Sequence, residues 1–227
     1  MKKILSFLLL FAFAGSAMAQ QNNFTPPRYK KIRKAIEKKE SGSYYPFLMQ
    51  RLQSNDTTLT VEDYHLLYYG YALQTGYAPY ATHPLADSLM SILRKEEVTG
   101  QDYEAIIRHG SALLLGNPFE IRFLDPLIYA HRMKGNQEMA ARLEFRFGRI
   151  IETIFGSGDG LSRETAFHVT SVSHEYDMLR ALGFGFGGQQ QLIDGKYDYL
   201  KVSKNDYGIE GMYFDVSVLL RSLSNLR

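Results

Sequence analysis

Apolar residues recur at helical spacing from Phe24 to about Phe155, and glycine, proline, asparagine and short polar runs interrupt them. Because spacing of three and four residues places side chains on one helix face, the pattern predicts about seven helices in this part of the chain. After Phe155 the pattern changes: Gly156-Ser-Gly-Asp-Gly160 interrupts the helix, and the following segments alternate at a period of two. Such alternation is typical of half-buried strands. We therefore expect a mainly helical chain with a small β-containing region at its C-terminal end.

The first predicted helix, near residues 27–39, has a strongly basic surface. Its apolar stripe consists of Tyr29, Ile32 and Ile36, which a helix brings to one face. Seven cations surround this stripe: Arg28, Lys30, Lys31, Arg33, Lys34, Lys38 and Lys39. Contact with an anionic membrane surface or a polyanion is one interpretation of this face, and a solvated helix face is the simpler one.

An internal repeat lies in the helical part. Thr60 and Asp63, followed by a tyrosine, match Thr99 and Asp102, which lie 39 positions later and are also followed by a tyrosine. The shared pattern Thr-x-x-Asp-Tyr is typical of a helix start, with the threonine as N-cap and the aspartate in the first turn. The repeat therefore predicts two equivalent helix starts.

Each of these starts leads into a predicted pair of helices. The second helices follow prolines and cover residues 85–97 and 119–134, and small residues at Gly70 and Gly110 would allow the paired helices to approach closely. A unit of about 40 residues cannot bury its apolar face alone and must stack on neighbours, as in α-solenoids. The stretch 127–140 resembles the centre of a tetratricopeptide repeat, with glycine at the turn between helices and alanine at the close crossing.

The C-terminal part is expected to contain short elements of both kinds. In chain order they are a strand over residues 165–172, a helix from an N-cap at Ser173 to Leu182, a glycine-rich loop over residues 183–188, and a last strand over residues 212–219. Asp194-Gly195 lies at the centre of Leu192-Ile-Asp-Gly-Lys-Tyr197, and this dipeptide suits the positive φ angles of a type I′ turn. A β-hairpin is therefore predicted there.

Four motifs in this part carry a family resemblance. They are Gly158-Asp-Gly-Leu-Ser-Arg-Glu-Thr-Ala-Phe-His-Val169, Ser171-Val-x-x-Glu-Tyr176, Gly208-Ile209 and Tyr213-Phe-Asp-Val216. With these motifs the chain resembles a family of secreted Bacteroidetes proteins that is classed as domain of unknown function 4919. The family has no catalytic or binding assignment, so the resemblance implies no functional residue.

The first residues are typical of an export signal. Two lysines precede an apolar run of 11 residues from Ile4 to Ala14, and Ala17-Met-Ala19 matches a small-residue cleavage site. The run is shorter than the roughly 20 residues of a transmembrane helix. We therefore expect residues 1–19 to be a signal peptide and the mature protein to be periplasmic or secreted, with no transmembrane segment.

Composition argues against several functional classes. Without the two leader lysines, 24 of the 26 basic residues remain and balance the 24 acidic residues, so the mature chain offers no electrostatic argument for nucleic-acid binding. The chain contains no cysteine, which excludes disulfides, thiol catalysis, iron–sulfur clusters, cysteine zinc sites and a lipid anchor on an N-terminal cysteine. No cofactor is predicted.

Histidines are the first candidates for chemistry. His168, His174 and Glu175 lie close together in the sequence, so a metal or acid–base site is one possibility. The spacings His-x-x-x-His and His-Glu-x-x-His are absent, and no metal site is predicted. Exposed or supporting histidines are the simpler interpretation, and Glu175 is more simply a favourable charge in the first turn of a helix.

Other motifs are unpersuasive. Gly183-Phe-Gly-Phe-Gly-Gly188 formally satisfies the dinucleotide pattern Gly-x-Gly-x-x-Gly, but a predicted helix precedes it and a predicted hairpin follows, which is the wrong context. Neither a Gly-x-Ser-x-Gly elbow nor a Walker loop occurs. Four aspartates in turn-rich surroundings could offer calcium ligands but lack EF-hand spacing, and turn aspartates usually hydrogen-bond their own backbone: Asp159, Asp194, Asp198 and Asp206.

Tyrosines are the other candidates, because six of the 16 lie within one stretch of 17 residues. Three of these six follow helical spacing and are predicted to pack in the repeat core: Tyr64, Tyr68 and Tyr71. The other three are candidate binding residues along a groove or helix-pair edge: Tyr69, Tyr77 and Tyr80. Tyrosine combines a large contact area with a polar tip, which suits peptide or sugar recognition. An aromatic core without a binding function is the simpler interpretation of the whole set.

The sequence thus predicts an α+β protein that is mainly α. A tetratricopeptide-like array over residues 20–156 would be capped by a β-containing region over residues 157–227. The leading functional hypothesis is a non-enzymatic periplasmic or secreted module that binds a protein or peptide on its concave helical face.

Two alternatives remain open. The first is a hydrolase acting on envelope material, in which His168 or His174 lies within hydrogen-bond reach of a carboxylate. The candidate carboxylates are Glu164, Glu175 and Asp215. The second alternative is self-assembly of the chain.

Overall fold

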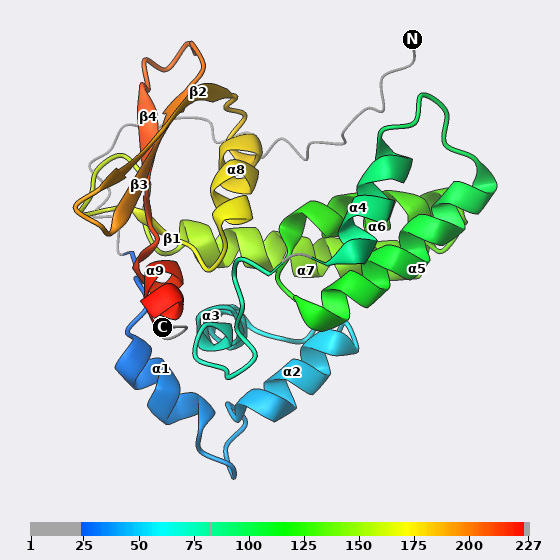
Figure 1. The fold of residues 1–227 in the computed structure, drawn as a ribbon. Coiled ribbons are helices and arrows are strands. Elements are labelled where there is room, and N and C mark those ends of the chain that lie inside the picture. Colours follow the sequence, from blue (N-terminus) through cyan, green and yellow to red (C-terminus); the bar gives the residue numbers. More distant parts are fainter. Residues whose placement is uncertain (1–23, 82, 225–227) are drawn as a thin grey trace.

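The computed structural model describes residues 24–81 and 83–224, which form nine helices and four strands (Figure 1). The N-terminal helices are α1 (Tyr29–Ile36), α2 (Tyr45–Gln53), α3 (Val61–Tyr71), α4 (Pro84–Leu93), α5 (Gly100–Gly116), α6 (Ile121–Met133) and α7 (Gln137–Phe155). The later elements are β1 (Phe167–His168), α8 (Val172–Ala181), β2 (Phe186–Ile193), β3 (Tyr197–Val202), β4 (Gly211–Asp215) and α9 (Ser217–Ser224). The predicted α+β class is confirmed, as are the seven N-terminal helices. The predicted signal peptide lies outside the described residues.

Two threonines begin helices as the repeat predicts. Thr60 precedes α3 and accepts a hydrogen bond from the backbone N–H of Asp63 (3.1 Å), whose carboxylate accepts one from the backbone N–H of Thr60 (2.9 Å). Thr99 and Asp102 form the same capping box at the start of α5. Each box pairs two backbone N–H groups that a helix start otherwise leaves free. Both N-cap predictions are confirmed.

The two copies of the repeat were predicted to form equivalent helix pairs, but only the second copy does so. In the second copy α5 packs against α6, and Gly110 faces the side chain of Leu127. In the first copy α3 packs against α1, α2 and α7, whereas α4 packs against α5. Gly70, the counterpart of Gly110, accordingly lies closest to Ile36 and Tyr45. The repeated sequence thus marks equivalent helix starts without producing equivalent helix pairs.

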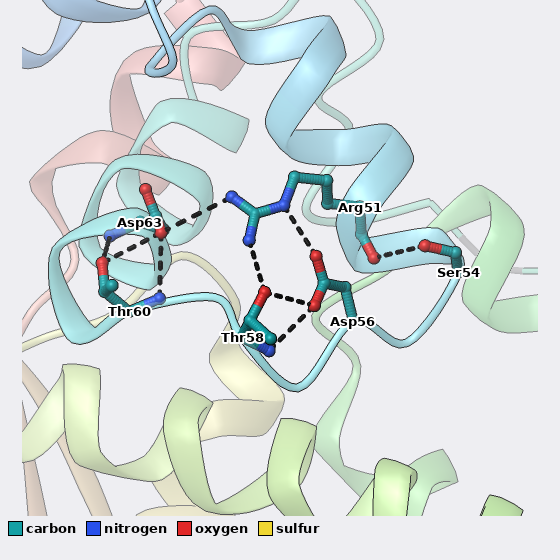
Figure 2. A network of polar contacts seen from close by, with 6 residues as sticks. All are labelled: Arg51, Ser54, Asp56, Thr58, Thr60 and Asp63. Carbon is teal, nitrogen blue, oxygen red and sulfur yellow. Dashed lines mark hydrogen bonds and ion pairs between the residues drawn. The ribbon is translucent and has the colours of Figure 1, made fainter.

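A polar network joins the end of α2 to the start of α3 (Figure 2). Arg51 donates to the carboxylate of Asp56 (2.7 Å) and to the hydroxyl of Thr58 (2.9 Å), and its guanidinium lies 3.9 Å from the carboxylate of Asp63. Hydrogen bonds from Thr58 and Arg51 lower the pKa of Asp56 to about 2. The network holds the turn between the two helices, and its charges pair with one another.

The strands form one mixed sheet in the order β1-β4-β3-β2. β1 and β4 are parallel and pair His168 with Asp215, whereas β4 with β3 and β3 with β2 are antiparallel. Asp194 and Gly195 both have positive φ angles, at 53° and 59°. The predicted type I′ turn between β2 and β3 is therefore confirmed.

The start of the C-terminal part differs from the prediction. The expected strand over residues 165–172 is paired only at β1, because α8 begins at Val172. The N-cap of this helix is Ser171, not Ser173. The strand is therefore cut short by a helix start that lies two residues earlier than expected.

Two later boundaries also differ. The expected glycine-rich loop over residues 183–188 is in part strand, since β2 begins at Phe186, and the backbone of β3 lies so close to Gly187 that a Cβ atom there would clash with it. The expected strand over residues 212–219 ends at Asp215, whose carboxylate accepts a hydrogen bond from the backbone N–H of Ser217 (3.0 Å) at the start of α9. The alternation of apolar residues that predicted a strand therefore extends beyond the end of β4 into α9.

One cluster of buried apolar residues runs through the helices and the sheet. Tyr68, Tyr69 and Phe119 contribute to it from the helical part, and Phe167 and Phe214 contribute from β1 and β4. Within residues 24–81 and 83–224, none of the helices combines the length and the hydrophobicity that a bilayer crossing requires.

Candidate functional site

Two carboxyl groups meet between α8 and the sheet. Glu175 lies in the first turn of α8 and is fully buried, and Asp198 of β3 is nearly so. No amide, hydroxyl or cationic donor of the described residues reaches either side-chain oxygen of Glu175. Burial raises the pKa of Glu175 to about 9, with a further contribution from the neighbouring Asp198. Glu175 therefore keeps its proton at neutral pH and shares it with Asp198.

Asp198 is positioned by side chains on both sides of the contact. The amide of Gln190 on β2 donates to its carboxylate (2.7 Å), and the hydroxyl of Tyr176 on α8 donates to the Gln190 carbonyl oxygen (2.7 Å). Burial raises the pKa of Asp198 as well, while the hydrogen bonds from Gln190 and Glu175 oppose that shift. Tyr176, Gln190, Asp198 and Glu175 thus form one chain of polar contacts, which we call the acid-pair cluster.

Aromatic side chains surround the acid-pair cluster on its accessible side. Tyr80, from the connection between α3 and α4, is 45% exposed, and burial and then the charges of Asp198 and Glu175 raise its pKa. Phe186 at the start of β2 is 41% exposed and stacks edge-on against Tyr176, with 5.3 Å between the ring centroids. The acid pair is therefore inaccessible, but its surroundings combine exposed aromatic rings with polar tips.

A second polar cluster lies at the carboxyl ends of the parallel strands β1 and β4. Oδ2 of Asp215 lies 3.7 Å from Nδ1 of His168 and 3.3 Å from Nζ of Lys196, and Oδ1 of Asp215 accepts hydrogen bonds from Ser217. Burial lowers the pKa of His168 and Lys196 adds to this, while Asp215 opposes it. A neutral imidazole beside an oriented carboxylate is an acid–base pair, although 3.7 Å exceeds hydrogen-bond reach.

His174 belongs to the core instead. Its Nε2 donates to the backbone carbonyl of Phe119 (2.8 Å), and its Nδ1 accepts from the hydroxyl of Tyr68 (2.7 Å), which in turn accepts from the backbone N–H of Thr170 (3.2 Å). Burial lowers the pKa of His174 to about 4. Both ring nitrogens are occupied, so this neutral histidine has no position left for a substrate or a metal.

The three candidate binding tyrosines take different places. Tyr69 is fully buried and donates to the backbone carbonyls of Thr153 (3.4 Å) and His168 (3.3 Å), so it does not line an open groove. Tyr77 is half-buried and donates to the carbonyl of Thr170 (2.8 Å). Both side chains thus join the helices to the C-terminal part. Of the three, Tyr80 alone offers a large exposed surface.

The partner of Glu175 was not predicted from the sequence. Asp198 was expected in a turn as a calcium candidate, whereas it lies in β3 with its side chain on the buried face beside Leu200 and Val202. The spacing of Asp198, Leu200 and Val202 could have indicated the buried position of Asp198, since residues two positions apart share one face of a strand. Pairing with Glu175 depends on the packing of α8, which no local pattern reveals.

The histidines and carboxylates named from the sequence do not come together in one site in the part of the chain that the structure describes. No group of three or more histidine, aspartate or glutamate side chains there is arranged to hold a metal ion. His168 and His174 lie in separate clusters, and Glu175 joins neither of them. The arrangement supports proton sharing at Glu175 and acid–base chemistry at His168 as separate features.

Comparison with known proteins places the chain in a family. Residues 30–225 match the family described as a domain of unknown function, DUF4919. No curated protein matches the chain, and no solved structure matches it either. The match covers the helical part and the sheet together, including both polar clusters. The chain therefore belongs to the DUF4919 family.

Proposed function

We propose that this protein is a non-enzymatic protein-binding module, exported to the periplasm or the cell exterior of a Bacteroidetes bacterium. The free edge of β2 holds an extended segment of its partner, and Tyr80 and Phe186 lie beside that segment. In this proposal helices α4 to α7, which pack on one another in chain order, provide a tetratricopeptide-like support. The predicted signal peptide supplies the route of export.

The observation that carries this proposal is that β2 is an exposed edge strand of the sheet. The strand stands at one end of the sheet order, so its outer backbone groups have no strand partner within the described residues. Seven of its eight residues are exposed. The segment Phe186–Ile193 contains neither a charge nor a proline, the residues with which proteins usually protect a sheet edge. After a register shift between Phe186 and Gln190, β2 pairs with β3 without interruption over Gln190–Ile193. An edge of this kind, free of charge and proline, binds an extended peptide by continuing the hydrogen-bond ladder.

Site-specific photo-crosslinking in the native cell tests the proposal. A photoreactive amino acid replaces Gln191 on β2 in one variant and Gln101 on α5 in a matched control, because both are exposed glutamines. We expect a discrete protein adduct at position 191 and none at position 101. The adduct should disappear when lysine replaces Gln189, since a charged edge resists strand addition.

Two results count against this proposal. One is the same set of adducts at both positions, which would reflect random collisions. The other is an adduct at position 191 that survives the Gln189→Lys substitution, which would place the contact on side chains and not on the strand edge.

A second candidate function is hydrolysis of envelope material, and the contact of His168 with Asp215 favours it. The side chain of His168 is 22% exposed, and its ring faces the carboxylate through Nδ1, which leaves Nε2 to take a proton from water. Hydrolysis of purified envelope glycans and esters should then be lost in His168→Gln and kept in His109→Gln. Equal rates for both variants would end this candidate.

A further inference from the structure

Helix α1 carries an exposed basic face that the proposed binding at β2 does not use. Seven cations and one acid lie in residues 28–39. All seven cations are exposed: Arg28, Lys30, Lys31, Arg33, Lys34, Lys38 and Lys39. Among them, Arg33 alone makes an ion pair within the described residues, with Glu37 at 3.5 Å, and both side chains of that pair are more than half exposed. The positive charge of this face is therefore largely uncompensated.

The apolar side of α1 is used inside the protein. Ile32 and Ile36 are buried in the core and α1 packs against α3, so the helix is held in place and cannot insert its apolar stripe elsewhere. Lys30, Lys31 and Lys34 lie on the side opposite these two residues, given the 100° rotation per residue of a helix. In Figure 1 α1 lies at the periphery of the molecule, next to α9 and away from the sheet.

The net charge of residues 28–39 is opposite in sign to that of the rest of the exported chain. The exported chain has 24 basic and 24 acidic residues, so the part outside residues 28–39 keeps 17 basic and 23 acidic residues. A helix of eight residues is about 12 Å long. Because the screening length at physiological ionic strength is about 8 Å, neighbouring cations on α1 act together on an opposing surface.

We propose that the basic face of α1 docks the exported protein on an anionic lipid surface. The binding is electrostatic and peripheral, since α1 has no free apolar side chain to insert. Clusters of four to eight cations on an amphipathic helix recognise anionic headgroups, and residues 28–39, which include α1, contain seven. The acidic remainder of the chain is repelled by the same surface, which orients α1 toward it.

Vesicle sedimentation tests the proposal on the chain from Gln20, which retains every described residue. We expect binding to vesicles containing phosphatidylglycerol and not to vesicles of phosphatidylcholine, with loss of binding as NaCl rises from about 50 to about 300 mM. The variant Lys30→Gln, Lys31→Gln, Lys34→Gln should bind about tenfold more weakly or worse. The matched control, Arg94→Gln, Lys201→Gln, Lys204→Gln, removes three exposed cations elsewhere and should bind like the parent.

Three outcomes overturn this inference. They are equal binding to both kinds of vesicle, equal loss of binding in both triple variants, and retention on a heparin column without vesicle binding. The last result would assign the face to a soluble polyanion. None of them bears on the strand edge of β2, which the photo-crosslinking experiment tests separately.

Discussion

At the scale of single residues, burial has opposite effects on the pKa of an acid and of a base, and both effects favour the neutral form. Burial raises the pKa of Glu175 to about 9 and lowers that of His174 to about 4. Arg146 is also buried, and its pKa falls to about 10, so it stays charged. Among the described residues it reaches the side chain of Asn55 and the carbonyl of Pro118, but no carboxylate. These buried groups link separate elements.

The acid pair should make stability depend on pH. Because the pKa of Glu175 is about 9 in the folded protein and 4.5 ordinarily, its contribution is complete below about pH 4.5 and is lost as the pH rises through 9. In Glu175→Gln, the free energy of unfolding should fall less between pH 5 and pH 9 than in the parent. Urea unfolding followed by circular dichroism at several pH values measures this difference.

Glu138→Gln is the control for this experiment, because the side chain of Glu138 is 82% exposed. Its pH profile should follow that of the parent. Identical profiles for the parent and Glu175→Gln would mean that Glu175 is ionised at neutral pH in the folded protein.

The hydroxyl of Tyr68 is the hydrogen-bond partner of two buried groups, one on His174 and one on Thr170. Tyr68→Phe leaves Nδ1 of His174 and the backbone N–H of Thr170 unpaired in the core. We expect a loss of roughly 1–3 kcal/mol in the free energy of unfolding. Chemical denaturation measures it, with Tyr207→Phe as the control because Tyr207 is 79% exposed. An equally small effect of both substitutions would contradict the assigned hydrogen bonds.

At the scale of elements, local signals were sufficient where a structure depends on neighbouring residues. The seven N-terminal helices, both capping boxes and the Asp194-Gly195 turn were predictable, since a cap or a turn is determined by residues two or three positions apart. Helix α9 was missed because residues 212–218 alternate as a strand would, and the cap at Asp215 outweighs that alternation. Helix pairing in the first repeat copy was missed because it depends on α1 and α2.

The candidate site was less predictable than the fold. Glu175 and Tyr80 were each named from the sequence, but for different functions, and tertiary packing brings both close to Asp198. His168 and His174 were expected in one site, yet β1 and α8 direct them to different clusters. Long-range contacts of this kind leave no trace in residue spacing.

The capping box of α5 gives a prediction at this scale. Thr99→Ala removes the acceptor for the backbone N–H of Asp102, so the free energy of unfolding should fall by about 1 kcal/mol. Thr57→Ala is the control, because Thr57 is exposed and lies in the loop before α3. Thermal unfolding followed by circular dichroism compares the two. Equal melting temperatures would indicate that Lys95, which pairs with Asp102 at 2.6 Å, holds the helix start by itself.

At the scale of the whole molecule, the shared core predicts that the helical part and the sheet unfold together. Phe214 of β4 is fully buried and packs against Phe167, with 5.8 Å between the ring centroids. Phe214→Ala should lower the free energy of unfolding by about 3–5 kcal/mol. It should also weaken hydrogen-exchange protection in α7 as well as in β3, because α7 contacts β1.

Leu161→Ala provides the comparison, since this side chain is 54% exposed and its loss should leave exchange unchanged in both elements. Protection lost in β3 but fully kept in α7 would show that the two parts unfold independently.

The strand order has a consequence for the time course of folding. β4 is the last strand in the chain, yet it lies between β1 and β3. A chain that emerges from a ribosome or a translocation pore with its N-terminus first exposes β1 and the β2–β3 hairpin before their common neighbour arrives. Until residues 211–215 are released, β1 has no strand to pair with and β3 keeps an open side. Chaperones that shield strand edges therefore have their greatest effect on this chain in the final moments of its release.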